Sequence, residues 1–164
     1  MPLEWKHLVP GLCTMDLDTF LAHAVKLEHE AVETYERFAA RATNVPEDTA
    51  VFLKEMAHYA RLHLGEILDH AGCRHADELP PRAYLWGDQA GPEALTALLS
   101  SGDAIDLDRA MTLAHEAERR AAHFYEGAAE ASADPRVNAL AREFAAEEHR
   151  HVLALERFMG LKPY

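Results

Sequence analysis

The sequence predicts an all-α protein, a four-helix bundle with one long crossover connection between its second and third helices. Apolar residues recur every three or four positions in four long segments, and a segment rich in proline and glycine separates the second from the third. The second pair of segments also repeats the first. With 164 residues and 49% apolar content, the chain can bury the core of a single domain, which we expect to span residues 1–164.

The first helix is expected to begin at about residue 16 and to end near residues 41–44, and the second is expected over about residues 46–72. Apolar side chains follow Asp16 with helical spacing, and acidic residues occupy the first turn. Pro46 suits the first turn of the second helix, and Gly72 suits its C-terminal end. Residues 1–15 contain two prolines and a glycine without a sustained period, so we expect an irregular N-terminal arm.

The third and fourth helices are expected over about residues 106–131 and 134–160. Asp134 followed by Pro135 is a typical helix start, and Gly160 is a typical stop. Residues 73–105 hold three prolines and three glycines, with one short helical piece over about residues 93–100. Such a crossover connection can span the length of a 26-residue helix, about 39 Å, and can therefore join two parallel helices.

Charge and cysteine content limit the classes of function. A formal net charge of −12 argues against nucleic acid and anionic membranes as partners. No apolar run approaches the length of a membrane span and no export signal is evident, so we expect a cytoplasmic protein. Cys13 and Cys73 form no Cys-x-x-Cys pair, which argues against a cysteine-bound iron site or a zinc ribbon and favours reduced thiols.

An internal repeat relates the two halves of the chain. At an offset of 90 residues Glu28 matches Glu118 and Tyr35 matches Tyr125, and at an offset of 88 His63 matches His151. Two helical hairpins related by duplication make a pseudo-symmetric bundle, in which equivalent residues face the central axis.

Helical phase places five polar residues on the apolar faces. Glu28, Glu118 and His63 each lie one turn from inward alanines, and Glu148-x-x-His151 lies on the same face as neighbouring large apolar residues. A buried carboxylate costs several kcal/mol unless it is paired or coordinates a cation. Each glutamate alone could be a paired core carboxylate, but their joint occurrence with two histidines favours metal binding.

Other polar residues have simpler interpretations. Glu55-x-x-His58 has the same spacing as the inward motif but lies beside the apolar stripe, so we expect it to be exposed and its match to be accidental. His149 is expected to be solvated, and His23 and His123 belong to no recognisable constellation.

These motifs resemble the ferritin-like di-iron carboxylate proteins, most closely the rubrerythrin-like branch. The residues that carry the resemblance are a glutamate seven positions before a tyrosine in the first and third helices, and Glu-x-x-His in the fourth. The resemblance covers about residues 16–159 and implies a ferritin-like four-helix bundle. It also implies five metal ligands, which are Glu28, His63, Glu118, Glu148 and His151.

One position departs from the family pattern. Ala60 stands where the second helix should carry the glutamate of Glu-x-x-His, so one bridging carboxylate is lost. His115 lies one turn before Glu118, where some relatives place an extra glutamate, and is a candidate for an extra ligand or for a structural role. The resemblance implies iron, most simply as a di-iron site, although imidazole and carboxylate ligands also suit Mn or Zn.

The resemblance implies an oxidoreductase that acts on peroxide or O₂. A separate electron donor would be needed, because the chain lacks the cysteine pairs of a rubredoxin-type tail. Tyr35 and Tyr125 are either core aromatics or groups that orient the glutamates or reduce the oxidised metal. Two alternatives stay open: non-catalytic binding or storage of iron or another divalent metal, and a degenerate member that holds one metal or none. A homodimer is expected.

Overall fold

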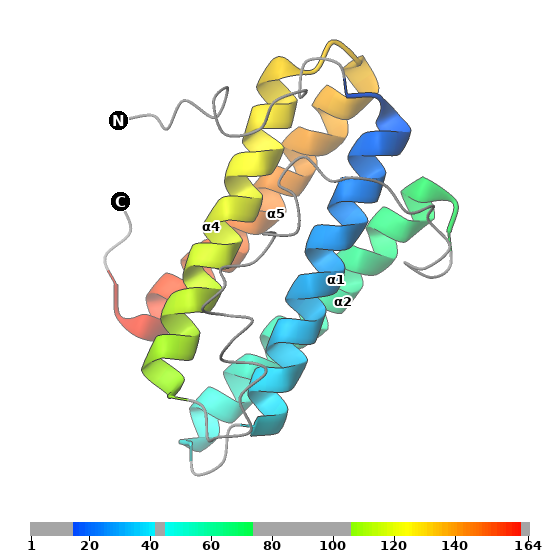
Figure 1. Cartoon of the computed structure of the whole chain (residues 1–164). Helices are drawn as coiled ribbons and strands as arrows, with labels where there is room; N and C mark the ends of the chain where they lie inside the picture. The colour runs from blue at the N-terminus through cyan, green and yellow to red at the C-terminus, as the bar shows by residue number, and fades with distance from the viewer. Residues whose placement is uncertain (1–14, 42–44, 74–105, 162–164) are drawn as a thin grey trace. The chain divides into compact units, whose positions relative to one another are not determined.

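The computed structural model describes residues 15–41, 45–73 and 106–161. These residues form four α-helices and no strand, which confirms the predicted all-α four-helix fold class (Figure 1). The helices are α1 (Leu17–Arg41), α2 (Glu47–Ala71), α4 (Leu107–Ala131) and α5 (Pro135–Met159), all close to their predicted bounds. Nearly all of the predicted arm (residues 1–15) and crossover connection (residues 73–105), with its short helix over residues 93–100, lies outside the described residues.

The described residues fall into two compact units. The α1–α2 unit contains the described parts of Leu21–Arg82 and Gly91–Ala114, and the α4–α5 unit contains the described parts of Met1–Phe20 and His115–Tyr164. No helix among the described residues is long and apolar enough to cross a membrane.

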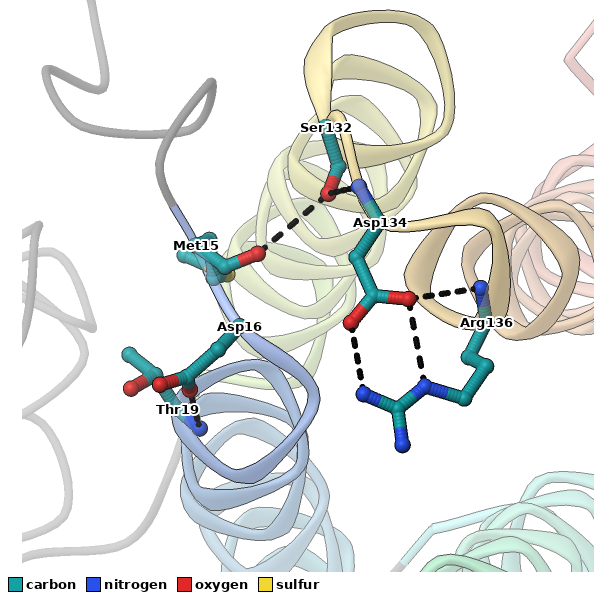
Figure 2. Close-up of polar contacts among 6 residues, drawn as sticks. All are labelled: Met15, Asp16, Thr19, Ser132, Asp134 and Arg136. Atoms are coloured by element: carbon teal, nitrogen blue, oxygen red, sulfur yellow. Dashed lines mark hydrogen bonds and ion pairs between the residues drawn. The ribbon is translucent and has the colours of Figure 1, made fainter.

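The α4–α5 unit is an antiparallel helical hairpin whose connection, residues 132–134, is fixed by polar contacts. The Asp134 carboxylate accepts a hydrogen bond from the backbone N–H of Arg136 at 2.9 Å and two more from its guanidinium, and so caps α5 (Figure 2). The side-chain amide of Asn138 donates to the carbonyl oxygens of Ala129 at 3.0 Å and Ser132 at 2.8 Å. The end of α4 is thereby tied to the first turn of α5.

Two further contacts anchor the start of α1 to this hairpin. The Ser132 hydroxyl donates to the carbonyl oxygen of Met15 at 3.3 Å, as Figure 2 shows. The ring of Phe20 stacks at centroid distances of 6.3 Å on Phe124 and 5.8 Å on Phe144, with Tyr125 edge-on to Phe144 at 5.5 Å. These rings are buried, and they form the aromatic part of the core of the α4–α5 unit.

In the α1–α2 unit, α1 and α2 also run antiparallel. The buried stripe of α2 follows the predicted period and includes Leu53, Met56, Ala60 and Ile67. Gly72 follows the last residue of α2; its φ of 70° is left-handed, and its N–H donates to the carbonyl oxygen of Asp69. This is the arrangement for which glycine is favoured at a helix C-terminus.

Candidate metal centre

The five residues predicted to face inward are buried, as helical phase requires. These residues are between 1% and 8% exposed, with Glu148 the most buried of them. By contrast Glu55 and His58 are exposed, as expected for the Glu-x-x-His spacing that lies off the apolar stripe. Helical phase therefore correctly predicts that Glu148-x-x-His151 is buried and that Glu55-x-x-His58 is exposed.

Three of these residues converge in the α4–α5 unit. Glu148 and His151 lie one turn apart on α5, and Glu118 faces them from α4. The Nδ1 atom of His151 lies 3.7 Å from Oε2 of Glu118 and 3.8 Å from Oε2 of Glu148. One ligand atom from each of the three residues lies within 4.8 Å of the others, and all three residues are buried.

These separations fit ligands of a shared cation better than direct hydrogen bonds. Hydrogen bonds to oxygen are about 2.7–3.2 Å long, shorter than either distance at His151. Ligand atoms about 2.1 Å from one ion, and 90° to 180° apart around it, lie about 3.0–4.2 Å from each other. Two carboxylates and one imidazole are donors that suit Fe, Mn or Zn. The buried Glu and His group can therefore hold a metal ion.

The protonation of His151 reflects the same two carboxylates. Burial by itself lowers the pKa of His151, but the adjacent Glu118 and Glu148 outweigh it and together raise the pKa to about 10. Without a metal, His151 is therefore a cation at neutral pH and offsets part of the carboxylate charge. A divalent ion at this place would have to displace that proton.

The α1–α2 unit brings together the other two predicted ligands. Nδ1 of His63 lies 3.4 Å from Oε2 of Glu28, and both side chains are almost fully buried. Ala60, one turn before His63 on α2, is 1% exposed, so its methyl group occupies a buried position where a glutamate would complete Glu-x-x-His. This unit thus brings together one carboxylate and one imidazole, whereas the α4–α5 unit brings together two carboxylates and one imidazole.

His115 is buried in the α4–α5 unit, where its Nε2 lies 3.0 Å from Oε1 of Glu156. Glu156 is a buried carboxylate that the sequence interpretation missed. The signal for it was available, because Glu156 follows the buried Val152 by four residues and extends the inward stripe of α5. The extra-ligand role of His115 stays a prediction.

The two tyrosines of the repeat are buried, with Tyr35 at 2% and Tyr125 at 0% exposure. The ring of Tyr125 packs edge-on against Phe20 and Phe144, as a core aromatic does. A role for either tyrosine towards the glutamates stays a prediction. His23, to which the sequence interpretation gave no place, is also buried at 1% exposure.

The fold and the site define a four-helix protein with buried Glu and His groups that can bind a metal ion. No protein-family model matches the sequence, and comparison with curated proteins gives no match. A crystal structure of COG1633, an uncharacterized conserved protein from Magnetospirillum magnetotacticum MS-1, matches with a TM-score of 0.72 and 33% identity over 92% of this chain and 97% of that one. The chain belongs to the COG1633 family. The match also agrees with the four-helix bundle fold.

Proposed function

We propose that the chain is a rubrerythrin-like metalloprotein that binds a divalent metal, iron in the first instance, through Glu118, Glu148 and His151. The observation that carries this proposal is the buried convergence of these ligand atoms at separations of 3.7 and 3.8 Å from Nδ1 of His151. Glu28 and His63 are the candidate ligands of a further ion.

Charge balance favours a divalent ion at the α4–α5 group. Two ionised carboxylates beside a protonated His151 leave one net negative charge in a buried place, which is costly. A divalent ion with neutral imidazole balances both carboxylates completely. The metal therefore removes an electrostatic cost that the protein alone only reduces.

In the catalytic form of this proposal, the bound metal supplies a redox centre for peroxide or O₂. Glu118, Glu148 and His151 would hold the ion, and their burial would limit the access of water to it. Tyr35 and Tyr125 are each expected to orient the glutamates of their own unit or to return an electron. Reducing equivalents come from a separate donor.

One observation favours a second candidate, a protein that binds or stores metal without turnover, with a single ion per chain. Ala60 is buried where the repeat calls for a glutamate, so the α1–α2 unit has lost a carboxylate that the α4–α5 unit keeps. Fewer negative ligands weaken the hold on a divalent ion, and loss of the metal at this position would leave a one-metal protein.

Metal analysis and peroxide addition test the proposal. Protein purified after growth with added iron is analysed for metal, reduced, and mixed with hydrogen peroxide while its absorbance is followed. Two irons per chain with prompt oxidation support the enzyme, and one metal with little oxidation supports the single-metal binder. Glu148→Ala should lose metal, whereas the matched control Glu55→Ala, from the exposed Glu-x-x-His, should keep it. Absence of metal in the wild type, or an unchanged metal content in Glu148→Ala, would refute both forms.

A further inference from the structure

A second cluster of metal-binding residue types lies on the surface of the α4–α5 unit. Glu126 of α4 contacts two histidines through its two carboxylate oxygens: Oε1 lies 2.5 Å from Nε2 of His149 on α5, and Oε2 lies 3.3 Å from Nδ1 of His123 on α4. Their side chains are 53%, 41% and 38% exposed for His149, His123 and Glu126. All three are therefore open to ions from solvent.

Local helix geometry explains the convergence. His123 and Glu126 are three residues apart on α4, so their side chains lie on the same helical face. His149 directly follows Glu148, and a step of one residue turns the side chain by about 100° around α5, away from the buried group. The antiparallel packing of α4 and α5 then brings His149 to Glu126.

We propose that His123, Glu126 and His149 form a surface site for a divalent cation of the Zn²⁺ class, separate from the buried group. Two imidazoles and one carboxylate form a donor set that suits Zn²⁺, with water completing the coordination. Both contacts are hydrogen bonds, and the two histidines contact different oxygens of Glu126. One shared ion therefore has to replace these hydrogen bonds, which requires a rotation of the exposed Glu126 or His123 side chain. Exposure of these side chains leaves room for that rotation.

The site stands independently of the proposed function. It uses no residue of the buried group, and it is reached directly from solvent. The alternative is that Glu126 only links the two imidazoles and so joins α4 to α5. That arrangement predicts no specific binding of a cation.

Zinc titration in a chain without the buried site tests the proposal. The parent variant is His63→Ala/Glu118→Ala/His151→Ala, which removes candidate ligands from both buried groups, and calorimetry with Zn²⁺ alone should give about one equivalent bound. Adding His149→Ala or Glu126→Ala should weaken that binding by about tenfold or more, because each removes one ligand. The matched control adds His58→Ala, which removes an exposed histidine outside the cluster, and should leave the binding unchanged. No zinc binding by the parent, or equal binding after His149→Ala, would overturn the proposal.

A measurement on the wild-type chain covers the case in which the parent variant does not fold. Zn²⁺ added to the protein should shift the imidazole signals of His123 and His149 together in the NMR spectrum, assigned by His→Ala variants, and leave those of His58 in place. If neither signal moves, the surface site does not exist. Failure of the proposed function appears elsewhere, as the absence of iron in the wild type, so the two outcomes are distinguishable.

Discussion

Metal binding at the α4–α5 group should release a proton from His151, and this gives a quantitative test of the site. The pKa of His151 is raised to about 10 because burial, which lowers it, is outweighed by Glu118 and Glu148. At pH 7.5 the ring is therefore almost fully protonated, and its deprotonation costs about 3 kcal/mol. Metal affinity should consequently rise about tenfold for each unit of pH between 6.5 and 8.5.

Calorimetry with Co²⁺ in buffers of different ionisation enthalpy measures this release directly. We expect about one proton per ion at pH 7.5, in the wild type and equally in the control His58→Ala. Substitution His151→Ala should abolish the release together with tight binding. Binding without proton release, or an affinity that is flat between pH 6.5 and 8.5, would refute the assigned protonation of His151.

The same pKa sets the pH dependence of stability in the metal-free protein. Because the folded-state pKa of His151 is above its ordinary value of 6.5, its stabilising contribution is complete below about pH 6.5 and is lost as pH rises towards 10. The free energy of unfolding of metal-free protein should thus fall over this range, as urea unfolding can measure. A stability that rises from pH 7 to pH 9 and is unaffected by His151→Ala would contradict this linkage.

Four substitutions test other parts of the structure. Ala60→Glu restores the carboxylate of Glu-x-x-His on α2. It should raise the metal content per chain and make the melting temperature more dependent on metal. An unchanged metal content would count against the role given to Ala60. Phe144→Ala removes a ring that is 1% exposed and should lower the free energy of unfolding by about 3–5 kcal/mol in urea titrations, where a loss below about 1 kcal/mol would show that its core packing is overstated. Gly65 lies at a helical position with nothing within 4 Å of an added Cβ, so Gly65→Ala should stabilise the folded protein by about 0.5–1 kcal/mol. Gly72 has a φ of 70°, so Gly72→Ala should destabilise the folded protein by about 1 kcal/mol. Thermal unfolding would contradict the helix assignment if both substitutions changed stability in the same direction.

The ends of the helices could be predicted because local residues set them. Pro46 precedes α2, Asp134 caps α5, and Gly72 and Gly160 adopt the left-handed conformation just after α2 and α5. Each of these effects depends on the residue and its immediate neighbours. The sequence alone therefore contains the information that determines the helix bounds.

The burial of the candidate ligands could be predicted from helical phase, but the contacts between side chains of different helices could not. Glu118 and Glu148 occupy inward positions that their own helices define. The contacts of His115 with Glu156, and of Glu126 with His149, depend on which turn of α4 meets which turn of α5. That register is set by the packing of the hairpin, which periodicity along one helix cannot specify.

Asn138 has a consequence that reaches beyond its turn. Its amide donates hydrogen bonds to the carbonyl oxygens of Ala129 and Ser132, and so fixes the position of α5 along the axis of α4. A slip of one residue moves α5 by about 1.5 Å, a large displacement beside the 3.7 Å between Nδ1 of His151 and Oε2 of Glu118. Substitutions in this turn, about 15 Å along the helix from Glu148, would therefore shift Glu148 and His151 relative to Glu118 and leave every candidate ligand intact.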